Sequence, residues 1–312
     1  MISSIFGKTK PVNFVILLSF IFFLYSIANV FILGRGLEDL NIFEEIVVLA
    51  VLLFSVFIMD FIVKRNKLSK NNSYVILFFT LFLMAFPDTL GDSKSILCSF
   101  FVLLAVRRIL SIKSLKNIKL KIFDASLWIL VASLFYDWGI LFMALVVFAI
   151  LIYEPKNLRN WLVILSSSIC FILILIGFLS VFNAVDWIWK HYTFQADFET
   201  LLTVQLTSSL KIVIFLILNA FLIVWAFVKL GKSGVGRIIM IRLVVLIFAL
   251  GLLLNLLVVS KDSNSLIIIF FPSAILATNY VQSIKKEKFR EILLIACILV
   301  PISIFFGRLL IS

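Results

Sequence analysis

Long apolar runs recur along the whole chain, and they restrict its fold more than any other feature of the sequence. Of the 312 residues, 63% are apolar and only 14% are charged, whereas about a quarter of residues are charged in a globular domain. The runs cover residues 11–33, 42–63, 73–86, 95–106, 122–135, 139–153, 161–181, 210–227, 238–259, 266–281 and 292–311. A helix needs about 20 apolar residues to cross the bilayer hydrocarbon. We therefore predict an all-α, polytopic transmembrane helix bundle of about 11 membrane segments, with residues 1–312 forming a single integral-membrane domain and no soluble domain.

The runs at residues 73–86, 122–135 and 139–153 are among those shorter than a full span. The last two meet at Tyr136-Asp137-Trp138. This hairpin either crosses the bilayer fully or enters and leaves it on one side. Both arrangements return the chain to the same side, so the sides of the later connections do not depend on the choice.

Basic residues are divided unequally between the connections, and this division predicts the orientation. With a cytoplasmic N-terminus, 22 of the 28 Lys and Arg residues lie in cytoplasmic segments. The others are Arg35, Lys94, Lys190, Lys211, Lys261 and Arg308. Cytoplasmic connections of membrane proteins are enriched in Lys and Arg. We therefore predict that the N-terminus is cytoplasmic and that the C-terminus lies on the outer side.

The same residue counts argue against several functional classes. The net charge of +12 is spread over six connections, whereas a nucleic-acid partner needs one continuous basic face; membrane lipid headgroups are the expected partner. One histidine cannot form a multi-histidine metal site, and the three cysteines are far apart and embedded in apolar runs, so neither a zinc site nor a disulfide framework is supported. We predict no metal and no cofactor.

Acidic residues show the opposite bias to the basic ones. Eleven of the sixteen carboxylates face outward in this topology, although membrane insertion does not require it. They gather in outer connections such as "GRGLEDLNIFEE" from Gly34, "FPDTLGDSK" from Phe86 and "SKDSNS" from Ser260. A fourth connection, "DWIWKHYTFQADFE" from Asp186, adds the only histidine, two tryptophans and a lysine. Chemistry at the outer face would explain this concentration.

The order of these features resembles the integral-membrane glycosyltransferases that take a sugar from a polyprenyl-phosphate carrier, the GT-C superfamily. That family carries an acid after the first helix, a proline and acid between the third and fourth, an aromatic loop with histidine after the seventh, and a late lysine before a helix with proline. The corresponding stretches are "EDL" at Glu38, "FPDTLGD" at Phe86, "WIWKHYTF" at Trp187 and "SKDSNSLIIIFFPSAILATNY" at Ser260. The opening "ISSIFGKTKPVN" also resembles an uncharacterised family of bacterial polytopic membrane proteins, which implies the bacterial inner membrane.

The resemblance and the chemistry together suggest a role for each candidate. Sugar transfer from a lipid phosphate needs a carboxylate that takes the acceptor's proton and cations that neutralise the phosphate leaving group. Glu38 or Asp39 is the candidate catalytic base. The candidate phosphate-binding residues are Arg35, Lys190, His191 and Lys261, and the candidate substrate-binding residues are Asp88, Trp187, Trp189 and Tyr192. A polyprenyl-phosphate sugar donor is the expected partner.

Structural roles compete with these assignments. Trp, Tyr and Lys beside a membrane helix are ordinary interfacial anchors, and Asp88 and Asp92 are suited to cap the helix that follows them. Asp60 and Asp124 are expected to pair with Lys64 or Lys121 near cytoplasmic helix ends. A non-catalytic subunit of an envelope assembly therefore stays an alternative. A transporter is less favoured, because it should carry charged or broken-helix positions at the bilayer midplane, and the runs are almost uniformly apolar there.

Overall fold

All regular structure in the described residues is helical. The computed structural model describes residues 2–8, 10–35, 41–195, 206–230, 234–258 and 264–311. The helices are α1 (Ile2–Phe6), α2 (Pro11–Ile27), η1 (Ala28–Ile32), α3 (Ile42–Asn66), α4 (Tyr74–Ala85), η2 (Pro87–Gly91), α5 (Ser93–Ser111), η3 (Ile112–Ser114), α6 (Ile118–Ala132), η4 (Asp137–Phe142), α7 (Met143–Tyr153), α8 (Leu158–Val181), α9 (Trp187–His191), α11 (Leu206–Leu230), α12 (Val235–Leu257), α13 (Ile267–Ser283) and α14 (Glu287–Ile311). Each predicted apolar run therefore coincides with helix.

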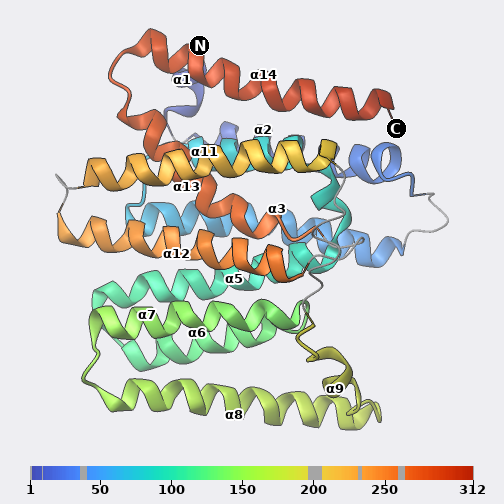
Figure 1. Ribbon diagram of the computed structural model, residues 1–312, viewed down its shortest axis with the longest axis vertical. Helices are drawn as coiled ribbons and strands as arrows, with labels where there is room; N and C mark the ends of the chain where they lie inside the picture. Colours follow the sequence, from blue (N-terminus) through green and yellow to red (C-terminus); the bar gives the residue numbers. More distant parts are fainter. Residues whose placement is uncertain are drawn as a thin grey trace.

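The long helices lie side by side with nearly parallel axes, with α14 along one edge of the bundle and α8 along the other (Figure 1). Within the described ranges, seven helices are long and apolar enough to cross a membrane. They cover Pro11–Ile32, Ile42–Asn66, Ser93–Ser114, Leu158–Val181, Leu210–Lys229, Val235–Leu257 and Glu287–Leu310. The prediction of an all-α fold is thereby confirmed for the described residues, and the seven candidate spans support a multi-pass membrane protein. The count of eleven segments and the orientation stay predictions.

Two short helices, α4 and α13, form the centre of the bundle. They pack against each other, α4 also contacts α14, and α13 also contacts α11 and α12. Nearly all of their side chains are buried. Rings of Phe82, Phe215 and Phe270 pack there with centroids 5.2 to 5.9 Å apart. Because longer helices surround α4 and α13, their ends can be covered by protein rather than lipid.

Several buried polar side chains inside the helices bond to their own backbone. The hydroxyls of Ser55, Thr80 and Ser273 donate to the carbonyl four residues earlier, at 2.7 to 2.9 Å. Asn219 Nδ2 donates in the same way to the carbonyl of Phe215 at 2.9 Å. Such bonds satisfy the three hydroxyls and one N–H of Asn219 within their helices, whereas Asn219 Oδ1 is buried without a hydrogen-bond partner among the described residues.

Connections that alternate along the chain meet at two opposite ends of the bundle. We call the end that holds residues 33–35, 86–92, 133–138, 182–195 and 264–266 the Asp92 end. The other is the Lys70 end, where the Lys70 backbone N–H donates to Gln282 Oε1 at 3.0 Å. The predicted cytoplasmic connections lie at the Lys70 end, and the positive-inside rule therefore predicts that the Asp92 end faces outward.

Ion pairs at the Lys70 end match one prediction and correct another. Lys64 Nζ lies 2.6 Å from Asp60 Oδ2, as expected. Asp124 pairs with Arg108 at 2.9 Å and not with Lys121. Lys121 Nζ instead donates to the Ser111 carbonyl at 2.7 Å. The prediction for Asp124 was wrong because α5 and α6 pack together and bring Arg108 within reach across the helix pair.

Labelling of single cysteines tests the orientation. In a variant with Cys98, Cys170 and Cys297 replaced by alanine, we expect a membrane-impermeant maleimide to label Asp186→Cys in intact spheroplasts. Lys116→Cys should react only after lysis, because the positive-inside rule keeps this basic connection in the cytoplasm. Both side chains are exposed, so access differs by side rather than by burial. The reverse labelling pattern would contradict the topology.

Candidate functional site

Asp92 joins three separate connections at the Asp92 end. It precedes α5, and its Oδ1 accepts the Ser95 backbone N–H at 3.0 Å, which caps the helix. Its Oδ2 accepts the Asn264 backbone N–H at 2.9 Å and the Tyr136 hydroxyl. The carboxylate side chain is buried. The capping role predicted for Asp92 is confirmed, and the same group also fastens the connections before α7 and α13.

Arg35 fastens the first connection to two neighbouring elements. Its Nη1 lies 3.1 Å from Glu45 Oε1 on α3, and its Nη2 donates to the Gly91 carbonyl of η2 at 2.5 Å. The Arg35 backbone N–H donates to the Asn29 carbonyl in the π-helical turn η1 at 3.2 Å. Glu45 also accepts the hydroxyl of Tyr25. Both terminal nitrogens of the guanidinium thus have protein partners, and these contacts hold the first connection against α3 and η2.

Residues 186–195 lie over the hairpin between α6 and α7. His191 Nε2 is 2.8 Å from the Ser133 carbonyl, and the Tyr192 hydroxyl is 2.9 Å from Ser133 Oγ. Because a carbonyl only accepts, Nε2 carries the proton of this hydrogen bond. The Trp187 ring stacks on His191 with centroids 4.4 Å apart. Burial raises the pKa of the Tyr192 phenol above its usual value, so this hydroxyl keeps its proton.

Asp137 completes the attachment of this stretch. Its Oδ2 accepts the Phe194 backbone N–H at 2.9 Å, and its Oδ1 accepts the N–H of Trp138 at 2.8 Å. Asp137 directly follows Tyr136, the residue that donates to Asp92. One chain of contacts therefore runs from Arg35 through Gly91, Asp92 and the hairpin to residues 186–195. All five connections at the Asp92 end are linked.

The sequence-predicted site residues fall into three sets. Glu38, Asp39 and Lys261 lie outside the described residues. Arg35, His191, Tyr192 and Trp187 are held by the contacts above, and Asp88 Oδ1 lies 3.4 Å from Arg308 Nη2. Lys190 and Trp189 are exposed on α9, and the Trp189 side chain is 80% exposed. Among the residues that the structure describes, no hydrogen bond or ion pair joins Arg35 to Lys190 or His191.

Two partners in this network were not identified from the sequence. Tyr136 and Ser133 belong to the hairpin that the sequence analysis treated only as a turn, yet they hold Asp92 and the His191 stretch. Their spacing from those partners, 44 residues for Tyr136 and 58 for Ser133, leaves no local pattern to detect. Within the described ranges, no three His, Cys, Asp or Glu side chains are grouped as metal ligands would be.

The described residues form an all-helical bundle with seven helices long and apolar enough to cross a membrane. The chain belongs to a family of unknown function (DUF6427), which matches residues 8–311. No curated protein and no solved structure matches the chain significantly. The family match carries no activity with it, so the resemblance to the polyprenyl-phosphate glycosyltransferases stays a prediction.

Proposed function

We propose that this protein transfers a sugar from a polyprenyl-phosphate carrier to a hydroxyl acceptor at the outer face of the bacterial inner membrane. The observation that carries the proposal is the linkage of all five connections at the Asp92 end. An enzyme that uses a lipid-borne donor needs its loops gathered at one membrane face. Linked connections meet this requirement, whereas dispersed ones would not.

The reaction assigns a role to each kind of side chain. The acceptor oxygen attacks the anomeric carbon of the sugar, and the bond from that carbon to the phosphate oxygen breaks. The electron pair leaves on the polyprenyl phosphate, and the acceptor proton passes to a carboxylate base. Glu38 or Asp39 supplies the base in this proposal, and cations at headgroup depth stabilise the leaving phosphate.

Lys190 is the cation best placed for the donor phosphate. A polyprenyl tail stays in the hydrocarbon, so its phosphate is held at the depth of the lipid headgroups. Lys190 is exposed on α9, next to the exposed Trp189, and such an aromatic ring can anchor the segment at the interface. His191 is a positioning residue, because its bond to the Ser133 carbonyl holds α9 against the hairpin. Lys261 is the second cation of the proposal.

A non-catalytic subunit of an envelope assembly is the second candidate. It is favoured by one observation: the side chains of Arg35, Asp92 and Asp137 bond to partners at the same end of the bundle. Bonds of this kind stabilise a protein without requiring any substrate. A transporter is less supported, since the buried hydroxyls of Ser55, Thr80 and Ser273 bond to their own helix backbones.

Binding of the donor lipid separates the two candidates. With protein in nanodiscs and undecaprenyl phosphate as the probe, we expect Lys190→Ala to weaken binding by about tenfold, because one charge-assisted contact to the phosphate is lost. Lys94→Ala is the matched control, since Lys94 is an exposed lysine at the same end, in the first turn of α5. Equal binding by wild type, Lys190→Ala and Lys94→Ala would leave residues 186–195 as an interfacial anchor.

A further inference from the structure

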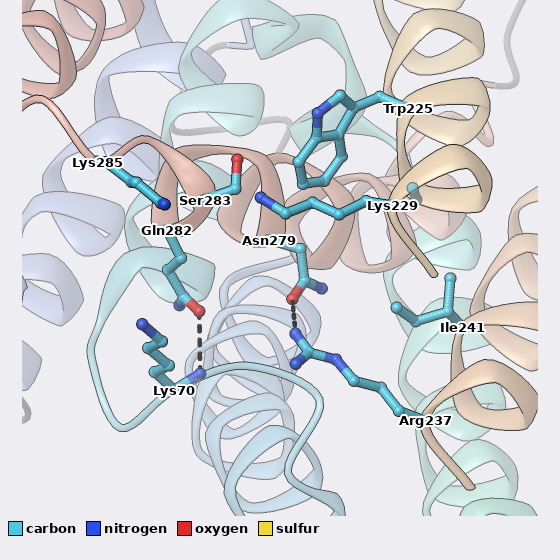
Figure 2. A pocket seen from close by; sticks show the side chains of 10 residues that line it. Lys70, Trp225, Lys229, Arg237, Ile241, Asn279, Gln282, Ser283 and Lys285 are labelled. Atoms are coloured by element: carbon cyan, nitrogen blue, oxygen red, sulfur yellow. Dashed lines mark hydrogen bonds between the residues drawn. The ribbon is translucent and has the colours of Figure 1, made fainter. Parts of the chain in front are cut away.

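A basic pocket lies at the Lys70 end, opposite the proposed transfer site. Its volume is about 310 Å³, and it is lined by the ends of α11, α12 and α13 together with the connections before α4 and after α13. Figure 2 shows Lys229 of α11, Arg237 of α12, Lys285 and Lys70 reaching toward it from different sides. This volume is near the lower limit of ligand pockets, which begins at about 300 Å³.

The charges of this pocket are unbalanced. Lys229 interacts electrostatically with Lys285, Arg237 and Lys70, and none of the described residues that line the pocket carries a carboxylate. Four like charges held together repel each other, and an anion between them removes this cost. The charge pattern therefore indicates an anionic ligand.

Neighbouring groups position these cations and add a hydrogen-bond donor. Arg237 Nη2 lies 3.3 Å from Asn279 Oδ1, which holds the guanidinium against α13. Lys229 Nζ lies 4.9 Å from the centre of the Trp225 ring. Gln282 accepts the Lys70 N–H with its oxygen, while its Nε2 is buried without a protein partner. Guanidinium, ammonium and amide N–H groups together suit the oxygens of a phosphate.

We propose that this pocket binds the phosphate headgroup of an anionic membrane lipid. The cations lie where membrane spans end, because the span in α11 ends at Lys229 and the span in α12 begins at Val235. This is the depth of lipid phosphates, and basic pockets between helix ends on the cytoplasmic side bind such headgroups. The cytoplasmic side is the side predicted for the Lys70 end.

Aromatic side chains next to the pocket offer an apolar surface that suits an acyl chain. The rings of Phe221 and Trp225 lie one helical turn apart on α11, and both pack on Tyr280 of α13, with centroids 5.7 and 5.1 Å away. Phe221 is 55% exposed although it lies well inside the span. A free phosphate ion makes no use of this surface, whereas a lipid covers it. The proposal does not depend on sugar transfer at the other end.

Retention of phosphatidic acid, measured by native mass spectrometry of the full chain, tests the site. We expect the double variant Lys70→Gln/Lys229→Gln to retain phosphatidic acid at least about tenfold less than wild type, because two charge-assisted contacts are lost. Lys116→Gln/Lys119→Gln removes two exposed lysines at the same end of the bundle, outside the pocket, and should retain the lipid. Lys70→Arg/Lys229→Arg keeps both charges and should also retain it.

Two results would overturn the assignment. Equal retention by the two glutamine double variants would place the lipid elsewhere on the basic surface. Displacement of the lipid by inorganic phosphate alone would assign the pocket to a free anion, because the acyl chain would then contribute nothing. Size-exclusion chromatography checks that each variant is folded.

Discussion

Replacing the proposed catalytic carboxylate by its amide is expected to cut the proposed sugar transfer by about 10²–10⁴, the usual contribution of a general base. The variants are Asp39→Asn and Glu38→Gln, each made alone, because the two acids are adjacent and either can be the base. An amide has nearly the same size but cannot take the proton of the acceptor hydroxyl. The measurement is transfer of a radiolabelled sugar from a polyprenyl-phosphate donor to acceptor hydroxyls in membranes.

Two controls separate this loss from damage to the protein. Binding of undecaprenyl phosphate should be unchanged in the variant that loses transfer, because the base acts on the acceptor rather than on the lipid. Asp186→Asn removes an exposed carboxylate from another connection at the Asp92 end and should keep full activity. Full activity in both single variants and in the double variant would exclude Glu38 and Asp39 as the base.

Asp92→Ala is expected to destabilise the folded protein by about 3 kcal/mol. The substitution removes the acceptor of three hydrogen bonds, from Ser95, Tyr136 and Asn264, and a buried donor left without a partner costs about 1–3 kcal/mol. Two of the three are backbone N–H groups, which cannot turn away. The midpoint of thermal unfolding in detergent measures the loss.

Two further substitutions at the Asp92 end show how much of the loss of stability comes from the hydrogen bonds of Asp92. Tyr136→Phe removes one hydroxyl donor and leaves the other two bonds of Asp92, so its effect should be about 1 kcal/mol. Asp186→Ala, at an exposed carboxylate of the same end, should shift the midpoint little. If Asp92→Ala unfolds at the same temperature as Asp186→Ala, the carboxylate does not hold these connections together.

Much of the helical structure follows from local sequence. The apolar run at residues 42–63 lies within α3, Ile42–Asn66, and the run at 161–181 lies within α8, Leu158–Val181. A bilayer contains no water to bond a free backbone, so a long apolar run must satisfy its own N–H and C=O groups as a helix. The capping of α5 by Asp92 could also be predicted from local sequence, because an acidic residue before a helix accepts the free N–H groups of its first turn.

Which helices pack against one another could not be predicted from local sequence. The helix α13 is apolar over most of its surface and almost wholly buried, so no polar face marks which side packs on α4 and which on α12. The pairing of Asp124 with Arg108, the bond from Tyr136 to Asp92 and the meeting of Lys70, Arg237 and Lys285 around one pocket all depend on this packing. They join residues of different helices and connections. Whether two such residues meet depends on how whole helices are ordered and rotated in the bundle. Hydropathy and charge determine that each segment is a helix and predict its side of the membrane, whereas side-chain packing between helices determines which residues meet.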